Sequence, residues 1–186
     1  DLPDTQPLAQ HLRRRLRAQA RGLGVSAASL FHLAWAQVLS RVAGRDDVVF
    51  GTVLLGRLQA GEGADRALGM FINTLPLRVR LAGKSVADAL IDTHARLSAL
   101  LAHEQASLAL AQRCSSASPL FNSLLNYRHT DADRDLILVP GIALLSSEDI
   151  LSYPLMLTVD DIASGFRVKA KAPRQVGAER LLDYLE

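Results

Sequence analysis

The sequence predicts an α/β fold, a β-sheet flanked by helices, because segments with helical periodicity alternate with segments that resemble strands. Leucines at helical spacing form an apolar stripe in residues 8–23. Residues 48–55 are a nearly continuous apolar run, which is typical of a strand covered on both faces. In residues 75–81 apolar side chains alternate with proline and arginine, so one face of this strand is expected to pack and the other to be polar.

The first two helices have clear ends. Gly22 and Gly24 end the helix that carries the leucine stripe. Ser26 follows as a candidate N-cap of a second helix with a wide apolar face, and Gly44 is placed to end that helix. The run 48–55 then forms the first strand, and a polar, glycine-containing loop follows it at residues 56–66.

The strand Asn73–Leu81 is followed by Ser85, a candidate N-cap for a long helix that extends to about Ala102. Five of its apolar residues are expected to face inward: Val86, Leu90, Ile91, Leu97 and Leu101.

The remaining chain predicts more strands and a last helix. Residues 120–127 and a segment within 136–145 are predicted strands. Residues 153–160 and 166–171 alternate well enough to form a hairpin. A helix is expected over residues 177–186.

Composition indicates a single domain of ordinary globular type. The chain has 186 residues, 49% hydrophobic and 22% charged, and its formal net charge is +2. So small a charge does not favour a nucleic-acid partner. Cys114 is the single cysteine, and no apolar run is long enough to span a bilayer. We therefore expect a cytoplasmic protein without a membrane segment, and we interpret the start of the chain as a linker in a longer protein.

Residues 69–78 are the most informative segment. A glycine that permits a turn and an apolar stretch lead to Asn73 and Thr74, which stand where the strand begins. Ends of strands are common places for functional groups. This segment closely resembles a signature of the condensation domains of nonribosomal peptide synthetases, in which a glycine, an aromatic residue and Asn-Thr lead into an arginine-terminated strand.

Three other blocks resemble the same family in the same order. They are residues 30–36 with 44–53, the degenerate block His103–Leu108, and residues 119–127. The resemblance implies the C-terminal lobe of the chloramphenicol-acetyltransferase-like condensation fold over residues 1–186. The family's catalytic motif has two adjacent histidines, three variable residues and then Asp-Gly, and it lies in the other half of the domain. The five histidines here are His11, His32, His94, His103 and His129, and no two are adjacent.

The resemblance also implies a function. A complete condensation domain joins two aminoacyl or peptidyl thioesters, which carrier proteins present on 4'-phosphopantetheine arms at opposite ends of a tunnel. This lobe would supply a tunnel wall and part of the carrier docking surface, with no cofactor or metal bound directly. Its expected partners are the N-terminal lobe and peptidyl carrier domains. An uncovered apolar face could also cause the isolated lobe to self-associate.

Six residues are candidates for the tunnel or the interface between lobes. A glycine in mid-strand, Gly51, often marks the close approach of a ligand or of another backbone. Asn73 either serves the site or satisfies the backbone of its own turn. Arg57 is either a structural or gating residue or an exposed loop charge. The other candidates are Thr52, Thr74 and Arg78.

Two further functions remain open: an epimerisation or heterocyclisation domain of the same superfamily, and a non-catalytic module that binds carrier proteins. Other motifs have structural interpretations. His94 is expected to be a hydrogen-bonded packing residue, and Cys114 a buried, inert thiol. The arginines between Arg13 and Arg21 are expected to form a solvated helix face.

Overall fold

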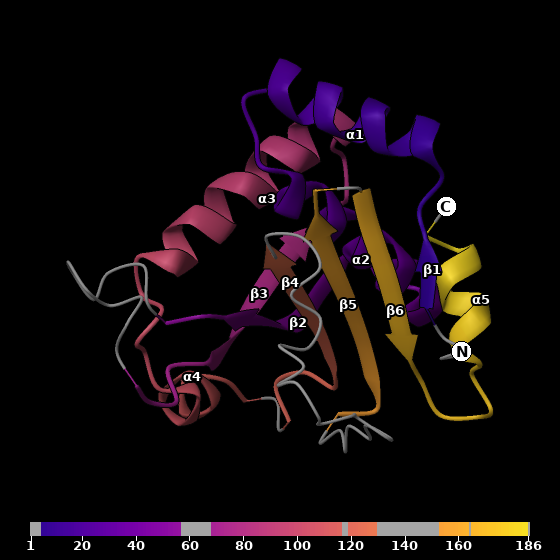
Figure 1. Cartoon of the computed structure of the whole chain (residues 1–186). Helices are drawn as coiled ribbons and strands as arrows, with labels where there is room; N and C mark the ends of the chain where they lie inside the picture. The colour runs from indigo at the N-terminus through magenta and orange to yellow at the C-terminus, as the bar shows by residue number, and fades with distance from the viewer. Residues whose placement is uncertain (1–4, 57–67, 117–118, 130–152, 164, 186) are drawn as a thin grey trace, which may run out of the picture.

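A six-stranded mixed sheet forms the centre of the computed structural model, which describes residues 5–56, 68–116, 119–129, 153–163 and 165–185. The strands are β1 (Thr5–Pro7), β2 (Asp47–Leu54), β3 (Asn73–Arg80), β4 (Ser123–His129), β5 (Leu155–Ile162) and β6 (Gly165–Lys171). Their order across the sheet is β1-β6-β5-β4-β2-β3 (Figure 1). The pairs β2–β4 and β4–β5 are parallel and the other three are antiparallel.

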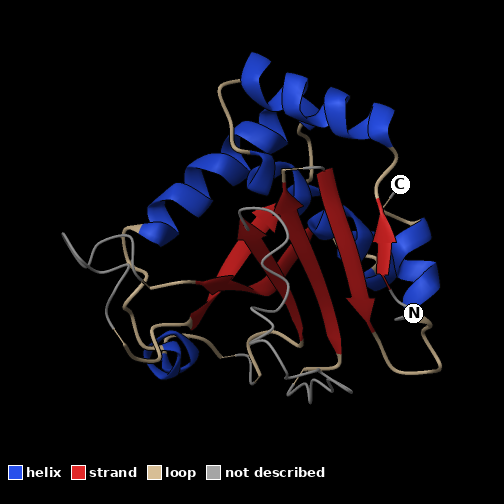
Figure 2. Ribbon diagram, viewed as in Figure 1, coloured by secondary structure: helices blue, strands red, loops and turns tan. Residues whose placement is uncertain are grey.

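Helices lie on one face of this sheet and across one end of it (Figure 2). They are α1 (Gln10–Gly22), α2 (Ala27–Ala43), α3 (Val86–Leu101), α4 (Leu108–Arg113) and α5 (Ala178–Asp183). Helix α2 lies behind the strands and contacts α1, α3, β2 and β4, while α5 packs on β6 and α4 on β3. The predicted α/β fold with flanking helices is confirmed.

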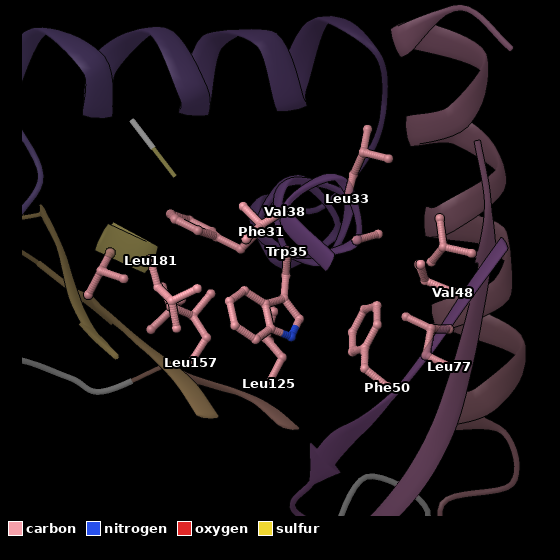
Figure 3. Packing of buried hydrophobic residues seen from close by; sticks show 14 of the residues in the cluster. Phe31, Leu33, Trp35, Val38, Val48, Phe50, Leu77, Leu125, Leu157 and Leu181 are labelled. Carbon is pink, nitrogen blue, oxygen red and sulfur yellow. The ribbon is translucent and has the colours of Figure 1, made fainter. Parts of the chain in front are cut away.

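Helix α2 fills the centre of the core. Its Trp35 side chain is fully buried and belongs to one cluster with Phe50, Leu125 and Leu157 of three different strands. Figure 3 shows Phe31, Trp35 and Val38 projecting from α2 among these strand residues. The apolar runs of the strands therefore pack against this helix. Each large side chain buried there stabilises the fold by about 1.5–3 kcal/mol.

The predicted helix ends are confirmed. The Ser26 hydroxyl accepts a hydrogen bond from the Ser29 N–H at 3.2 Å, and Ser85 caps α3 in the same way through the Asp88 N–H at 3.1 Å. Gly44 ends α2 in the left-handed conformation, with φ of 61°, which costs a glycine little. The hairpin is also confirmed. Its connecting turn is shorter than predicted, because β5 extends to Ile162 and β6 begins at Gly165.

Other expectations about elements were wrong. β4 begins at Ser123, three residues after the predicted start, and two short elements, β1 and α4, were not foreseen. Val86 and Ile91 of α3 are 67% and 50% exposed instead of buried. Cys114 is exposed, contrary to expectation. The strand predicted within residues 136–145 lies outside the described residues.

The arginine face of α1 is only partly solvated. Arg17 pairs with the buried carboxylate of Asp161, and its guanidinium lies 4.8 Å from the centre of the Phe166 ring. The Tyr127 hydroxyl donates to the same carboxylate at 2.6 Å. Burial raises the pKa of Tyr127, and its hydrogen bond to Asp161 raises it further, so the phenol remains a donor. Arg17 therefore fastens α1 to the ends of β4, β5 and β6, while Arg14 and Arg15 are exposed as expected.

Two histidines have packing roles. His94 makes a 3.0 Å hydrogen bond with the Ser29 hydroxyl, as expected. His32 is buried between α2 and β2, where its Nδ1–H donates to the Ala28 carbonyl at 2.7 Å. Its Nε2, 2.7 Å from the Thr52 hydroxyl, is then the acceptor. Burial lowers the pKa of His32 to about 4, so the ring is neutral at pH 7.

No single helix within the described residues is long and apolar enough to cross a membrane. Residues of α1 and α2 reach the required length and composition only together, and the two helices are bent by 108° at the break between them.

The buried neutral His32 predicts a specific acid sensitivity. Its pKa is about 4 in the folded state against 6.5 for a free histidine. The unfolded state therefore binds more protons, so stability should fall as the pH drops from 6.5 to about 4 and change no further through this group below that. The integrated loss is about 3 kcal/mol.

The measurement is urea unfolding of the wild type and of His32→Gln between pH 7.5 and pH 4. Glutamine can keep hydrogen bonds but does not titrate. The wild type should lose more free energy of unfolding than the variant over this range; parallel pH profiles would contradict the assignment.

Candidate functional site

Three segments that are far apart along the chain meet where β2 ends and β3 begins. Gly56 follows β2, Asn73 opens β3, and Gln105 lies in the turn after α3. We call these three residues, with Glu104 and Ala106, the polar hub. Hydrogen bonds from the two side-chain amides of the polar hub join all three segments.

The Asn73 amide is fully engaged. Its Nδ2 donates to the carbonyls of Glu104 and Ala106, each at 2.8 Å, and its Oδ1 accepts the Thr74 N–H at 2.9 Å. Asn73 thus bonds to the backbone of the next residue, and it also binds a turn more than 30 residues away in sequence. The start of β3 is thereby fixed against the end of α3.

Gln105 and Gly56 complete the polar hub. The Gln105 Nε2 donates to the Gly56 carbonyl at 2.7 Å. Gly56 has φ of 67°, and a Cβ atom added to it would lie 1.9 Å from the Phe71 carbonyl oxygen. Only glycine fits both the conformation and the space. Sequence analysis did not select Gln105, although it lies within the His103–Leu108 block that carried part of the resemblance.

Gly51 and Thr52 lie where the two halves of the sheet join. β2 and β4 pair through only two residue pairs, Gly51 with Leu124 and Thr52 with Leu125. By contrast, β2 pairs with β3 over eight residues and β4 with β5 over seven. The join is therefore a short parallel ladder at the centre of the sheet.

Gly51 and Thr52 make contacts on opposite faces of the sheet. A Cβ atom on Gly51 would lie 2.3 Å from Leu124 Cδ2 and 2.5 Å from Phe121 Cε2, so the close approach at this glycine is made by the chain's own side chains. The Phe121 ring in turn stacks on Tyr153 with centroids 5.4 Å apart. Thr52 points to the helix face and bonds to His32.

Arg78 lies at the other end of the β2–β3 ladder. It forms a two-pronged pair with Asp47, with distances of 2.8 Å to Oδ1 and 2.6 Å to Oδ2. This hydrogen-bonded pair holds the pKa of Asp47 below its usual value. Arg78 also borders an open groove of about 1480 Å³ whose other walls include Cys114 and Phe121.

The predicted site residues thus form two groups and one outlier. Asn73 and Thr74 belong to the polar hub or adjoin it, Gly51 and Thr52 form the ladder at the centre of the sheet, and Arg78 is remote from the hub. Arg57, the sixth predicted residue, lies outside the described residues.

The hydrogen bonds of the polar hub hold backbone segments in position. The side chains of Asn73 and Gln105 hold these segments through bonds from their amides to carbonyls. Within the part of the chain that the structure describes, no group of three His, Cys, Asp or Glu side chains could hold a metal ion. The arrangement can hold the end of β2, the start of β3 and the turn after α3 in fixed positions.

The sequence model of the family described as "Condensation domain" matches residues 4–176. The chain belongs to the condensation-domain family. Malpibaldin synthetase of Mortierella alpina is 49% identical over 183 residues, which are 96% of this chain and 3% of that protein. Nonribosomal peptide synthetase 4 of Gibberella zeae is 39% identical over 124 residues, 65% of this chain and 2% of that protein. The chain therefore spans a small part of the synthetases it resembles.

A solved structure shows the same fold. The condensation domain of the monacolin K polyketide synthase MokA superposes with a TM-score of 0.76 at 16% identity, over 97% of this chain and 44% of that one. The resemblance to condensation domains of nonribosomal peptide synthetases is confirmed, and so is the fold that it implied. Condensation domains of such synthetases work with carrier-protein domains.

Replacing Asn73 with alanine should destabilise the fold. The change removes two hydrogen bonds to carbonyls in a half-buried position, and we expect a loss of about 1–2 kcal/mol in the free energy of unfolding. Denaturant titration measures this loss. Asn122→Ala is the matched control because that asparagine is exposed, and its effect should stay within about 0.5 kcal/mol. Equal effects of the two substitutions would contradict the role of the polar hub.

Gly51→Ala should also destabilise, by about 1–3 kcal/mol, because the new methyl group overlaps Phe121 and Leu124. Gly22→Ala is the control: nothing lies within 4 Å of the added carbon, and the substitution should be neutral or stabilising. Adding Phe121→Ala to Gly51→Ala should cost less than the two single losses added together, because the deleted ring makes room for the methyl group. Strict additivity in the double-mutant cycle would argue against the overlap.

Proposed function

We propose that this chain is the C-terminal half of a nonribosomal peptide synthetase condensation domain that joins two carrier-bound thioesters by an amide bond. The observation that carries this proposal is that two family-like blocks, residues 69–78 and 103–108, meet in the polar hub through the Asn73 amide. Two facts support the assignment to one half of a domain. The chain spans 44% of a solved condensation domain, and its sequence has no adjacent histidines.

In this proposal the chain positions the substrates, and it does not transfer protons. The Asn73 amide and the Gln105 amide hold the end of β2 and the start of β3, and these two strand ends form one wall of the substrate tunnel. The thioesters arrive on 4'-phosphopantetheine arms, which are parts of the substrates. Bringing two tethered reactants together is worth about 7–11 kcal/mol in well-oriented cases, so a rigid wall contributes to the rate without a base.

The absence of adjacent histidines in this sequence predicts that residues 1–186 alone form no amide bond. Loaded donor and acceptor carriers are incubated with this chain, with a complete condensation domain that contains it, or with no enzyme, and the products are identified by mass spectrometry. Product is expected only with the complete domain. Product from the isolated chain would overturn the division of roles, and carrier binding without product from the complete domain would favour a binding module.

The same assay examines the polar hub in the complete domain. Asn73→Ala should slow amide formation by more than its loss of stability explains, whereas Asn122→Ala should change neither. An unchanged rate at a temperature where the variant is fully folded would remove Asn73 from the site.

A further inference from the structure

Helix α1 carries five arginines and no acidic residue. Arg13 and Arg17 face the β5–β6 hairpin. Arg14, Arg15 and Arg21 are exposed, and we call these three residues the arginine ridge. Arg14 and Arg21 are seven residues apart, so they lie on the same side of the helix, about 10 Å apart along its axis. Figure 1 shows α1 on the outside of the fold, across one end of the sheet.

The arginine ridge has no acidic partner within the part of the chain that the structure describes. No hydrogen bond or ion pair among the described residues engages its three side chains. Other arginines of the chain are engaged. Arg78 and Arg80 both pair with Asp47, and Arg128 pairs with Asp160. The positive charge of the ridge is therefore not balanced by any described acidic side chain.

The composition of α1 differs from that of an ordinary solvated helix face. Such a face usually mixes both signs, because an acidic residue four positions before a basic one stabilises the helix. Acidic residues also stabilise the first turn, where the helix dipole is positive, and α1 has none there. The helix therefore lacks both contributions. A surface of one sign instead complements a partner of the opposite sign.

The helix that carries the arginine ridge is fixed to the fold. Its Ala20 is buried, and its Arg17 pairs with the buried carboxylate of Asp161. The Arg17 guanidinium also lies 4.8 Å from the centre of the Phe166 ring. β1, which leads into α1, pairs with β6 over three residues. The ridge therefore has a set direction before any partner binds, and on binding only its side chains lose freedom.

We propose that the arginine ridge binds a carboxylate-bearing surface of a separate protein domain. Guanidinium groups bind carboxylates through paired hydrogen bonds, as Arg78 binds Asp47 in this chain. A nucleic acid fits less well, because proteins that bind one carry a broad basic surface, whereas the ridge offers three cations on a chain of net charge +2. This inference does not rest on the proposed function.

The test measures the binding of a helical peptide, about four turns long with glutamates along one face, to a complete condensation domain that contains residues 1–186. Arg14→Gln with Arg21→Gln removes two charges of the ridge, and Arg41→Gln with Arg174→Gln removes two exposed charges elsewhere. Both pairs should leave the melting temperature unchanged. The first pair should weaken binding about fivefold and the second by less than about twofold. Equal weakening would overturn the proposal.

Other results would also overturn it. Equally strong binding of the same peptide with glutamine in place of glutamate would show that the ridge does not recognise acidic groups. Tighter binding of duplex DNA than of the acidic peptide would identify a nucleic-acid surface. Binding by residues 1–186 but not by the complete domain would show that the rest of the domain covers the ridge. Peptide binding is measured without carriers, so its outcome is independent of amide formation.

Discussion

The short parallel ladder between β2 and β4 is the constraint on which the rest of the structure depends. It joins the β2–β3 pair to the other four strands through two residue pairs, Gly51 with Leu124 and Thr52 with Leu125. So short a join needs support from both faces. Phe121 and Leu124 close over Gly51 on one face, and His32 bonds to Thr52 on the other, which ties the ladder to the central helix α2.

The position of the polar hub follows from this ladder. β2 leaves the ladder at Thr52 and reaches Gly56 four residues later, so the direction of β2 determines where the Gly56 carbonyl meets Gln105. Asn73 is opposite Leu54 in the β2–β3 register and reaches the same turn from the next strand. A shift at the ladder would therefore move the Gly56 carbonyl and the Asn73 amide relative to the turn after α3.

Local sequence signals predicted most of the fold. Ser26, Gly44 and Ser85 define helix ends through their own backbone chemistry, and the hairpin strands follow from alternation, so the sequence suffices for these features. β1 was missed because its three residues are a strand only through pairing with β6, a long-range contact. The burial of Ile91 was wrong because helical spacing does not show where the sheet lies relative to a helix.

The candidate site was predictable only in part, for the same reason. Asn73 was found because it opens a strand in a recognised segment, whereas the two carbonyls that it binds belong to a turn more than 30 residues away. Gln105 lies in the block 103–108 that carried part of the resemblance, but its carbonyl partner, Gly56, is 49 residues away in sequence and could not be read from that block. Gly51 was selected for close approach, and the structure shows that Phe121 and Leu124 make that approach.

The chemistry of the polar hub also suits the role proposed for it. The Asn73 and Gln105 side chains are neutral amides bonded to carbonyls, so these donors do not titrate and salt screens them less than the exposed pair of Arg78 and Asp47. The strand ends that these bonds join are already fixed in the folded chain, which reduces the conformational entropy lost when a substrate binds beside them.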